Sequence, residues 1–467
     1  MSNNQLFRLI PKVDVVLEKE RIKEVVTVYG KEPVKEAIGY ELDKIRKYLS
    51  KDPSEDGLKE KLDVLEQNVI NLVTEKKKSN LKHVINATGV ILHTNLGRAP
   101  LPQKALDDLM VKMQGYMNLE YDLKAGKRGE RYSHFEKLIC EITGAEAAMA
   151  VNNNAAAALL MVSAVGNGKE VVVSRGEQIE IGGKFRIPDI IDQSGCKRIE
   201  VGTTNKTRLS DYEEVITEDC GALLKVHTSN YKVLGFTESV EREDLVQLGK
   251  KHGVPVIEDL GSGVLIDLSR YGLRKEPTVQ ESIKAGVDVV CFSGDKLFGG
   301  PQAGILAGKK EWIELCKKHP LTRAMRIDKC TAAMLETVFS MYEDEAYAVK
   351  NIPVLNIMTT PLETLKEKAN RFAAMLKEAL DERVKVDILL CENPVGGGSL
   401  PGEMLPSYAV TLQGENLQVD AFADALREGE LPIVVRLWEN HILFDVRTMY
   451  EKEFEATVEV IKEKWNI

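Results

Sequence analysis

Residues 289–304 read Val-Val-Cys-Phe-Ser-Gly-Asp-Lys-Leu-Phe-Gly-Gly-Pro-Gln-Ala-Gly, and this stretch decides the fold. An apolar, partly β-branched run ends in a serine, a glycine, an acid and a lysine, and two more glycines soon follow. The pattern predicts a buried strand that turns sharply at its end. We therefore expect Lys296 at the rim of a sheet. Partial burial there disfavours its ammonium form and leaves its amine able to attack a carbonyl.

Short apolar runs alternate with helix-like segments around this stretch. The runs are 147–151, 171–174, 223–227, 255–260 and 288–293, and helical spacing marks 155–165 and 241–252. The alternation predicts an α/β fold with a mostly parallel sheet covered by helices, whose ligands bind at the carboxyl ends of the strands. The uncharged stretch 147–168 contains three asparagines and ends in Gly-Asn-Gly, so it predicts a strand, turn and helix rather than a membrane span.

The sequence predicts three domains. Helix-spaced apolar positions in 21–30, 42–49 and 58–73, with breaks at Pro33 and 51–57, predict a small helical domain over residues 1–80. Residues 81–350 form the expected α/β domain. Residues 351–467 predict a smaller α+β domain. Its expected elements are a helix at 362–380, strands at 384–391 and 408–412, a helix at 419–428, a β pair at 433–447 and a last helix at 452–464.

Composition restricts the possible partners. The 467 residues carry a net charge of -9, so the protein as a whole lacks the positive potential that would attract nucleic acid such as DNA. Residues 1–80 hold 16 Lys/Arg and 15 Asp/Glu, so a polyanion approaches this segment more easily than the acidic remainder. Taken alone, the lysine cluster at 76–78 indicates a solvated linker. Seven cysteines without a C-x-x-C pair argue against disulfides and a metal site, and they suit a reducing cytoplasm. Residues 1–20 contain no apolar signal-peptide core.

Several strand ends carry groups that pyridoxal 5'-phosphate (PLP) requires. Lys296 can form a Schiff base with the aldehyde, and Asp259, 37 residues earlier at the end of another run, can hold the protonated ring nitrogen. Asn153 and Asn154 open a helix whose amides can bind the phosphate, and Ser293 can add a hydroxyl. The alternatives are a turn aspartate and simple asparagine N-caps. The combined order of these groups favours PLP.

Two rim positions are less specific. His227 ends the run 223–227 and can contact the ring or the phosphate, although a lone histidine there is more often structural. Glu177 lies at another expected rim without a clear role.

The stretch 85–101 reads Ile-Asn-Ala-Thr-Gly-Val-Ile-Leu-His-Thr-Asn-Leu-Gly-Arg-Ala-Pro-Leu. Together with 292–304, and over essentially the whole chain, it resembles bacterial selenocysteine synthase, the L-seryl-tRNA(Sec) selenium transferase family. The resemblance implies a fold-type I PLP-dependent transferase that assembles as a homodecamer, a pentamer of dimers. It also implies conversion of L-seryl-tRNA(Sec) to L-selenocysteinyl-tRNA(Sec), by β-elimination of water and addition of selenium from selenophosphate.

The resemblance also implies roles for particular residues. Lys296 is the Schiff-base lysine and Asp295 an acid/base candidate. Arg98, Arg323 and Arg326 match arginines implicated in binding the anionic selenium donor, which suits bidentate guanidinium contacts. The alternative for Arg323 and Arg326 is a pair of helix-surface charges. The N-terminal domain corresponds to the tRNA-binding part.

Two rival functions share some of these features. A PLP-dependent lyase or transferase acting on a small free amino compound needs the same lysine but no RNA-binding domain. A tRNA-binding scaffold on a retired enzyme fold needs no intact site, and the presence of Asp259, Ser293 and Lys296 argues against it. Arg447 lies where some related enzymes bind a free carboxylate. Because the substrate carboxyl is esterified to RNA, we expect a structural role or a dimer contact for it.

Overall fold

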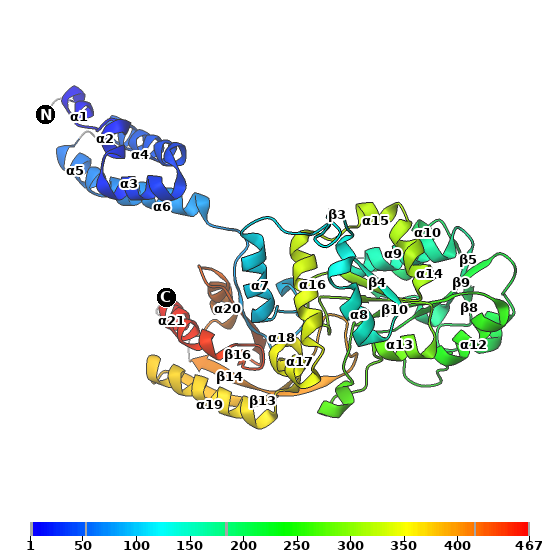
Figure 1. The fold of residues 1–467 in the computed structure, drawn as a ribbon. Helices are drawn as coiled ribbons and strands as arrows, with labels where there is room; N and C mark the ends of the chain where they lie inside the picture. Colours follow the sequence, from blue (N-terminus) through cyan, green and yellow to red (C-terminus); the bar gives the residue numbers. More distant parts are fainter. Residues whose placement is uncertain (1–2, 52–53, 183–184, 415–416, 466–467) are drawn as a thin grey trace. The chain divides into compact units, whose positions relative to one another are not determined.

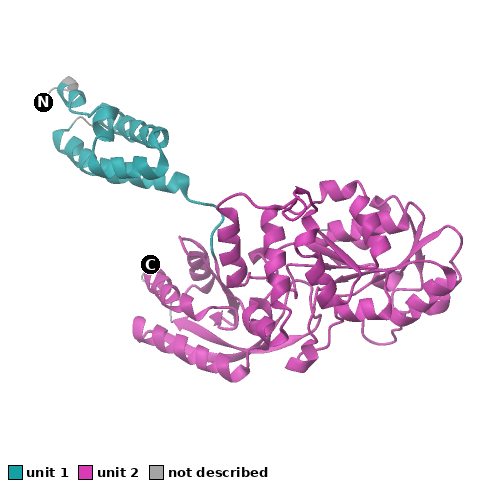
Figure 2. Ribbon diagram, viewed as in Figure 1, with its two compact units in different colours: residues 1–83 teal, residues 84–467 magenta. Residues whose placement is uncertain are grey.

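The chain divides into two compact units, residues 1–83 and residues 84–467 (Figure 2). A computed structural model describes residues 3–51, 54–182, 185–414 and 417–465. Within these ranges no helix combines the length and apolar character needed to cross a membrane.

The first unit is helical, as expected for residues 1–80. Its helices are α1 (Asn3–Arg8), α2 (Val13–Leu17), α3 (Glu20–Tyr29), α4 (Lys31–Lys51), α5 (Glu55–Asp63) and α6 (Leu65–Lys77). They enclose a core of their own, with Ile38, Leu42 and Val69 fully buried. Pro33 lies in the first turn of α4, where proline is tolerated, so the break falls before it at Gly30. The run 58–73 is divided near Val64 into two helices rather than one.

A seven-stranded sheet forms the larger part of the second unit (Figure 1). In spatial order its strands are β4 (Ala147–Val151), β12 (Gly304–Gly308), β11 (Val289–Ser293), β10 (Val256–Gly261), β9 (Cys220–Val226), β5 (Glu170–Ser174) and β8 (Lys197–Val201). The five strands from β11 to β8 are parallel, and β12 is antiparallel to both of its neighbours. All five runs predicted from the sequence are strands of this sheet, whereas β8 and β12 were not predicted.

Helices on both sides of this sheet bury its apolar strands. They include α8 (Glu136–Thr143), α9 (Asn154–Gly166), α10 (Ile187–Gln193), α12 (Arg242–His252), α13 (Val279–Ala285) and α14 (Lys310–Lys318). The predicted strand, turn and helix over 147–168 is confirmed as β4 and α9. Most of α9 is buried, which explains why its sequence carries no charge.

A second, five-stranded sheet has the order β1-β15-β16-β14-β13. Its strands are β1 (Ile85–Ala87), β13 (Val384–Pro394), β14 (Met404–Gly414), β15 (Ile433–Trp438) and β16 (His441–Asp445), and it packs with α19 (Leu362–Ala379), α20 (Val419–Arg427) and α21 (Phe454–Trp465). The sequence places residues 85–87 in the 81–350 domain, but β1 pairs in parallel with β15, with Ile85 opposite Ile433. This N-terminal segment therefore completes the C-terminal sheet.

Gly89 anchors the chain that leaves β1. Its backbone has φ +82°, and a Cβ there would lie 2.4 Å from Asn393 Nδ2 and 2.6 Å from Asp445 Oδ2. Its amide donates to Thr448 Oγ1 at 3.0 Å. Asp445 is fully buried and accepts from Ser407 Oγ at 2.6 Å. Because a side chain at position 89 would clash, only glycine lets the I-N-A-T-G segment lie this close to the buried carboxylate of Asp445.

We expect Gly89→Ala to lower the free energy of unfolding by about 1–3 kcal/mol, because it adds both backbone strain and a steric clash. Gly272→Ala is the matched control, since Gly272 has φ +75° but no atom within 4 Å of an added Cβ. Thermal denaturation followed by circular dichroism compares the two. Equal losses in both variants would show that the contact with Asp445 contributes nothing.

Candidate functional site

Lys296 lies in a tight turn that directly follows β11. Backbone hydrogen bonds that hold the turn include those from Gly294 N to Ala303 O at 2.8 Å, from Gly300 N to Gly294 O at 2.8 Å and from Leu297 N to Ser262 O at 3.1 Å. The residue is only 3% exposed. Burial lowers the pKa of Lys296, and the negative charge of Asp259 partly opposes this effect. The site therefore favours the neutral amine that attacks a carbonyl.

Asp259 lies on the neighbouring strand β10, opposite Cys291 of β11. Its Oδ1 accepts a hydrogen bond from Asn154 Nδ2 at 2.8 Å. Burial raises the pKa of Asp259, while the Asn154 hydrogen bond and the charge of Lys296 oppose the rise. The other oxygen, Oδ2, is buried and has no hydrogen-bond partner among the described residues. A protonated ring nitrogen of PLP would satisfy this acceptor.

Further buried polar atoms lie at the same strand ends. Within the described residues, the hydroxyls of Ser229 and Ser262 and Oδ1 of Asn154 also lack partners. A Cβ at Gly263 would lie 2.4 Å from the carbonyl of Ser293, so the loop after β10 packs closely against the end of β11. Such unsatisfied groups in a tight polar site fit a bound polar cofactor. The sequence analysis assigns neither Ser229 nor Ser262, although each lies two residues after a predicted strand.

The two asparagines at the start of α9 make different contacts. Asn153 caps the helix, with its side chain accepting from Ala156 N at 2.9 Å. Asn154 instead reaches Asp259, a contact that periodicity cannot reveal. The first helical amides point away from the helix, where they can bind phosphate. Ser293 ends β11 and is buried.

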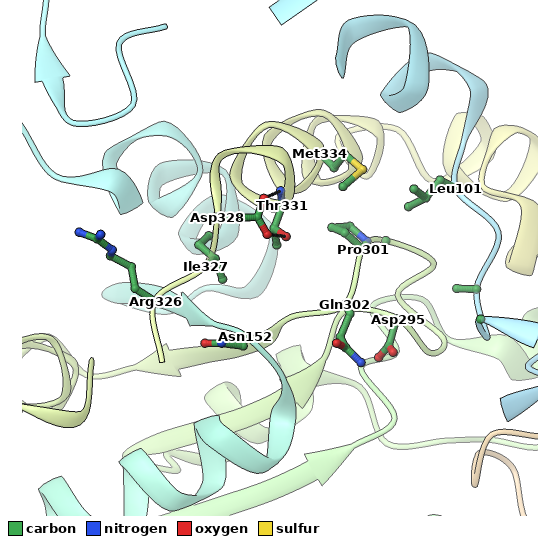
Figure 3. Close-up of a pocket in the computed structure, with 13 residues that line it drawn as sticks. Leu101, Asn152, Asp295, Pro301, Gln302, Arg326, Ile327, Asp328, Thr331 and Met334 are labelled. Atoms are coloured by element: carbon green, nitrogen blue, oxygen red, sulfur yellow. Dashed lines mark hydrogen bonds between the residues drawn. The ribbon is translucent and has the colours of Figure 1, made fainter. Parts of the chain in front are cut away.

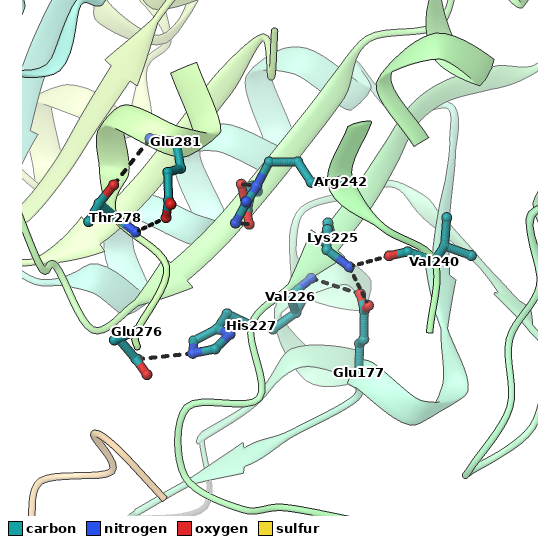
Figure 4. Close-up of polar contacts among 10 residues, drawn as sticks. Glu177, Lys225, Val226, His227, Val240, Arg242, Glu276, Thr278 and Glu281 are labelled. Carbon is teal, nitrogen blue, oxygen red and sulfur yellow. Dashed lines mark hydrogen bonds and ion pairs between the residues drawn. The ribbon is translucent and has the colours of Figure 1, made fainter. Parts of the chain in front are cut away.

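Charged side chains around the carboxyl end of β9 form pairs with one another (Figure 4). His227 Nε2 lies 2.9 Å from Glu276 Oε1. Glu177 accepts from Lys225 Nζ at 3.0 Å and from the amide of Val226 at 2.9 Å. The buried Glu177 therefore ties the loop after β5 to the end of β9, a role that the sequence left open. His227, just after β9, is held by Glu276 through Nε2.

Arg98 and Asp295 form an ion pair of 2.9 Å next to Lys296. Arg98 has φ 60°, an unusual conformation for a residue with a side chain, and it follows Gly97, which has φ 89°. Asp295 is 6% exposed. It faces a cavity of about 630 Å³ whose other lining residues include Asn152, Gln302 and Arg326 (Figure 3). The structure thus joins Arg98, Asp295 and Arg326 in one region although they are distant in sequence.

The three predicted anion-binding arginines differ in position. Arg326 follows the short helix α15 (Leu321–Ala324) and forms an isolated bridge with Val151. The interpretation of Arg323 and Arg326 as two charges on one helix face is therefore wrong, because the helix ends before Arg326. Arg323 is exposed on α15 and is not among the described residues that line the cavity.

Arg447 lies in the second sheet's region and is buried. Its guanidinium donates to the carbonyl of Ile357 at 2.6 Å and to that of Pro406. These contacts agree with the structural role expected for it.

We expect Asn154→Ala to shift the shared proton from the ring nitrogen toward Asp259, because the carboxylate loses the hydrogen bond that lowers its pKa. The NMR signal of an isotopically labelled PLP ring nitrogen should move toward that of neutral pyridine, and turnover should fall about tenfold. Asn153→Ala is the control. It removes a helix cap but should leave this signal in place, so identical signals in the two variants would contradict the assigned role of Asn154.

Comparisons with known proteins point to one family. The family model described as L-seryl-tRNA selenium transferase matches residues 84–450, and the model described as selenocysteine synthase N terminal matches residues 7–46. Curated proteins named L-seryl-tRNA(Sec) selenium transferase are similar over nearly all of their length. That of Clostridium botulinum (strain Okra) is 46% identical over 99% of both chains, and that of Caldanaerobacter subterraneus is 48% identical over 98% of both.

A solved structure of D-glucosaminate-6-phosphate ammonia-lyase has the same fold, with a TM-score of 0.57, 22% identity, and coverage of 84% of this chain and 98% of its own. The fold is that of fold-type I PLP-dependent enzymes, which confirms the predicted fold class. The two family models together cover most of the chain, and both correspond to the resemblance found in the sequence. The chain belongs to the L-seryl-tRNA selenium transferase family.

Proposed function

We propose that this protein converts L-seryl-tRNA(Sec) to L-selenocysteinyl-tRNA(Sec) with PLP as cofactor and selenophosphate as selenium donor. The observation that carries the proposal is the buried Lys296 beside Asp259, in a chain that is 46% identical over 99% of its length to a protein with this named activity. When bound, PLP supplies an electron-withdrawing ring that stabilises negative charge at the carbon next to the substrate's amino group.

The residues of the site support β-elimination followed by addition. Lys296 would hold the cofactor, and its amine, when free, would remove the Cα proton of the seryl group. Asp259 would keep the ring nitrogen of the cofactor protonated. Asp295 is positioned by Arg98 and assists departure of the β-hydroxyl as water. The substrate's carboxyl is esterified, so Arg447 can remain engaged with backbone carbonyls.

The anionic selenium donor requires cationic partners close to Asp295. Arg98 supports this assignment because it pairs with Asp295, and Arg326 supports it because it lines the same cavity as Asp295. Arg323 is exposed nearby in sequence, and we assign it to the approach of the donor. Guanidinium groups bind tetrahedral oxyanions by paired, charge-assisted hydrogen bonds. Ser293 and the first turn of α9, capped by Asn153, are assigned to the cofactor phosphate, and His227 to the cofactor's surroundings.

We assign tRNA binding to the helical unit of residues 1–83, with the α/β part at 84–350 carrying chemistry and 351–467 completing the second sheet. Proteins dock on RNA helices mainly through shape and backbone contacts. Lys76 and Lys77, in the last turn of α6, are exposed and suit such contacts.

We also propose a homodecamer built from dimers and working in the cytoplasm. The helix α7 (Gln103–Met113) exposes Met110 and Val111, and Tyr116 beyond it is fully exposed. Large apolar side chains exposed close together in sequence support subunit contacts. All seven cysteines are free thiols, which suits a reducing compartment.

Lys296→Ala should abolish both the visible absorbance of the bound cofactor and the turnover of seryl-tRNA with selenophosphate, because the amine that holds PLP and moves the proton is missing. Single-turnover assays and absorbance spectra measure the two effects. Lys310→Ala, at an exposed lysine that begins α14, is the control and should keep both properties. Full turnover by the Lys296 variant would refute the proposed chemistry.

A chain of residues 84–467 should retain cofactor absorbance but bind tRNA about a hundredfold more weakly, because the removed unit supplies the assigned phosphate contacts. Filter binding at several salt concentrations gives the affinity and its salt dependence. If the shortened chain binds tRNA as tightly as the full chain, the assignment of the helical unit is wrong.

A further inference from the structure

Glu276 is a buried carboxylate that holds the ring of His227 (Figure 4). Its Oε1 lies 2.9 Å from His227 Nε2, and the residue is only 3% exposed. Within the described part of the chain, each of these two side chains is the other's only hydrogen-bond partner. A buried carboxylate without a donor is costly, so the His227 ring offsets the desolvation of Glu276.

His227 lies beside residues that the proposed function assigns to the cofactor. Its amide donates to the carbonyl of Asp259 at 2.9 Å, so the histidine follows β9 directly next to the end of β10. Burial lowers the pKa of Lys296, and the charge of Glu276 is among those that oppose this effect, after that of Asp259. The pair of His227 and Glu276 therefore contacts the aspartate and acts electrostatically on the lysine.

The chain around Glu276 is held in place. The residue precedes α13, which begins with a capping box: Thr278 Oγ1 accepts from Glu281 N at 3.2 Å, and Glu281 Oε2 accepts from Thr278 N at 2.9 Å. The amide of Val279 also donates to the carbonyl of Val264, in the loop after β10, at 3.2 Å. A carboxylate on such a fixed segment can set the orientation of the ring that it holds.

The ring of His227 has a second nitrogen, Nδ1. Because an ionised carboxylate only accepts hydrogen bonds, Nε2 carries the proton that faces Glu276. Nδ1 has no hydrogen-bond partner among the described residues. Of the polar groups of PLP, the aldehyde, the ring nitrogen and the phosphate already have candidate partners, which leaves the ring hydroxyl. A histidine next to Asp259 with one free ring nitrogen suits that hydroxyl.

We propose that Glu276 is a positioning residue, which orients His227 so that Nδ1 would hydrogen-bond the ring hydroxyl of the bound cofactor. The inference deepens the proposed function and rests on it only for the identity of PLP as the cofactor. Glu276 would not touch the cofactor, so its effect passes through the histidine. The pair would therefore serve the cofactor through one ring nitrogen while the other nitrogen fixes the ring.

The dissociation constant and the absorbance spectrum of PLP in the full chain test this role without tRNA or selenium. Glu276→Gln should weaken PLP binding about tenfold and shift the absorbance band, because an amide either donates or accepts and no longer fixes the ring. Glu276→Asp keeps the charge but shortens its reach, so its effects should be smaller. Glu281→Gln is the matched control. It removes a carboxylate from the same segment without a contact to His227, and it should leave both properties unchanged.

Two variants of His227 separate the roles of the two ring nitrogens. Asparagine places a polar atom near the position of Nδ1, whereas glutamine places one near that of Nε2. His227→Asn should therefore bind PLP within about threefold of wild type, and His227→Gln should bind about tenfold more weakly. In the His227→Gln background, Glu276→Gln should have no further effect, because Glu276 acts through the histidine.

The inference is overturned if His227→Gln binds PLP more tightly than His227→Asn, because the histidine then only satisfies Glu276. It is also overturned if Glu276→Gln weakens binding equally in the wild-type and His227→Gln chains, which would indicate a direct charge effect on Lys296. Circular dichroism checks folding, and the two His227 variants with Glu276→Asp decide the matter if Glu276→Gln does not fold. PLP binding that follows these expectations, without selenium transfer by the wild type, would instead count against the proposed function.

Discussion

The carboxylate of Asp259 is the constraint on which the site depends. It belongs to the central strand β10 and is buried, and burial of a charge without partners is costly. Asn154 satisfies one oxygen, while the other, Oδ2, is buried without a hydrogen-bond partner among the described residues. A protonated group next to Oδ2 would offset the cost of burying this acceptor. The strands and the start of α9 together therefore create a buried acceptor that the pyridinium of PLP would satisfy.

The same sheet edge sets the state of Lys296. Parallel strands β10 and β11 place Asp259 and the turn after Ser293 at neighbouring ends, so one residue's negative charge acts on the other's amine. The ion pair of Arg98 with Asp295 lies next to Lys296 in sequence, at the cavity. Glu120 pairs with the arginines at 128, 131 and 326, of which Arg326 lines the same cavity. In both places a protein carboxylate neutralises an arginine. Such pairs limit the cost of holding cations in a partly buried site.

The sequence predicted the features that depend on local pattern. Apolar runs located five strands of the large sheet, and the order Asp259, Ser293, Lys296 indicated the cofactor because strand ends meet at one edge. The sequence patterns did not predict strand β12 (Gly304–Gly308), which begins and ends in glycine. They also did not predict contacts between residues that are distant in sequence. No periodicity reveals that Asn154 contacts Asp259, that Glu177 binds Lys225, or that Glu120 collects arginines from two segments. These contacts follow from tertiary packing, as does the pairing of residues 85–87 with the C-terminal sheet.

The β1–β15 pairing has a consequence for how the protein is made. Ribosomes release the chain from its N-terminus, and the helical unit with its own core can fold as soon as residues 1–83 have emerged. Residues 85–87, next in line, find their strand partner only when residues 433–435 have been synthesised. During most of translation this short strand has no pairing partner, and Gly89 cannot yet pack against Asp445. The I-N-A-T-G segment therefore takes its native place in one of the last steps of folding, because its strand partner lies near the C-terminus.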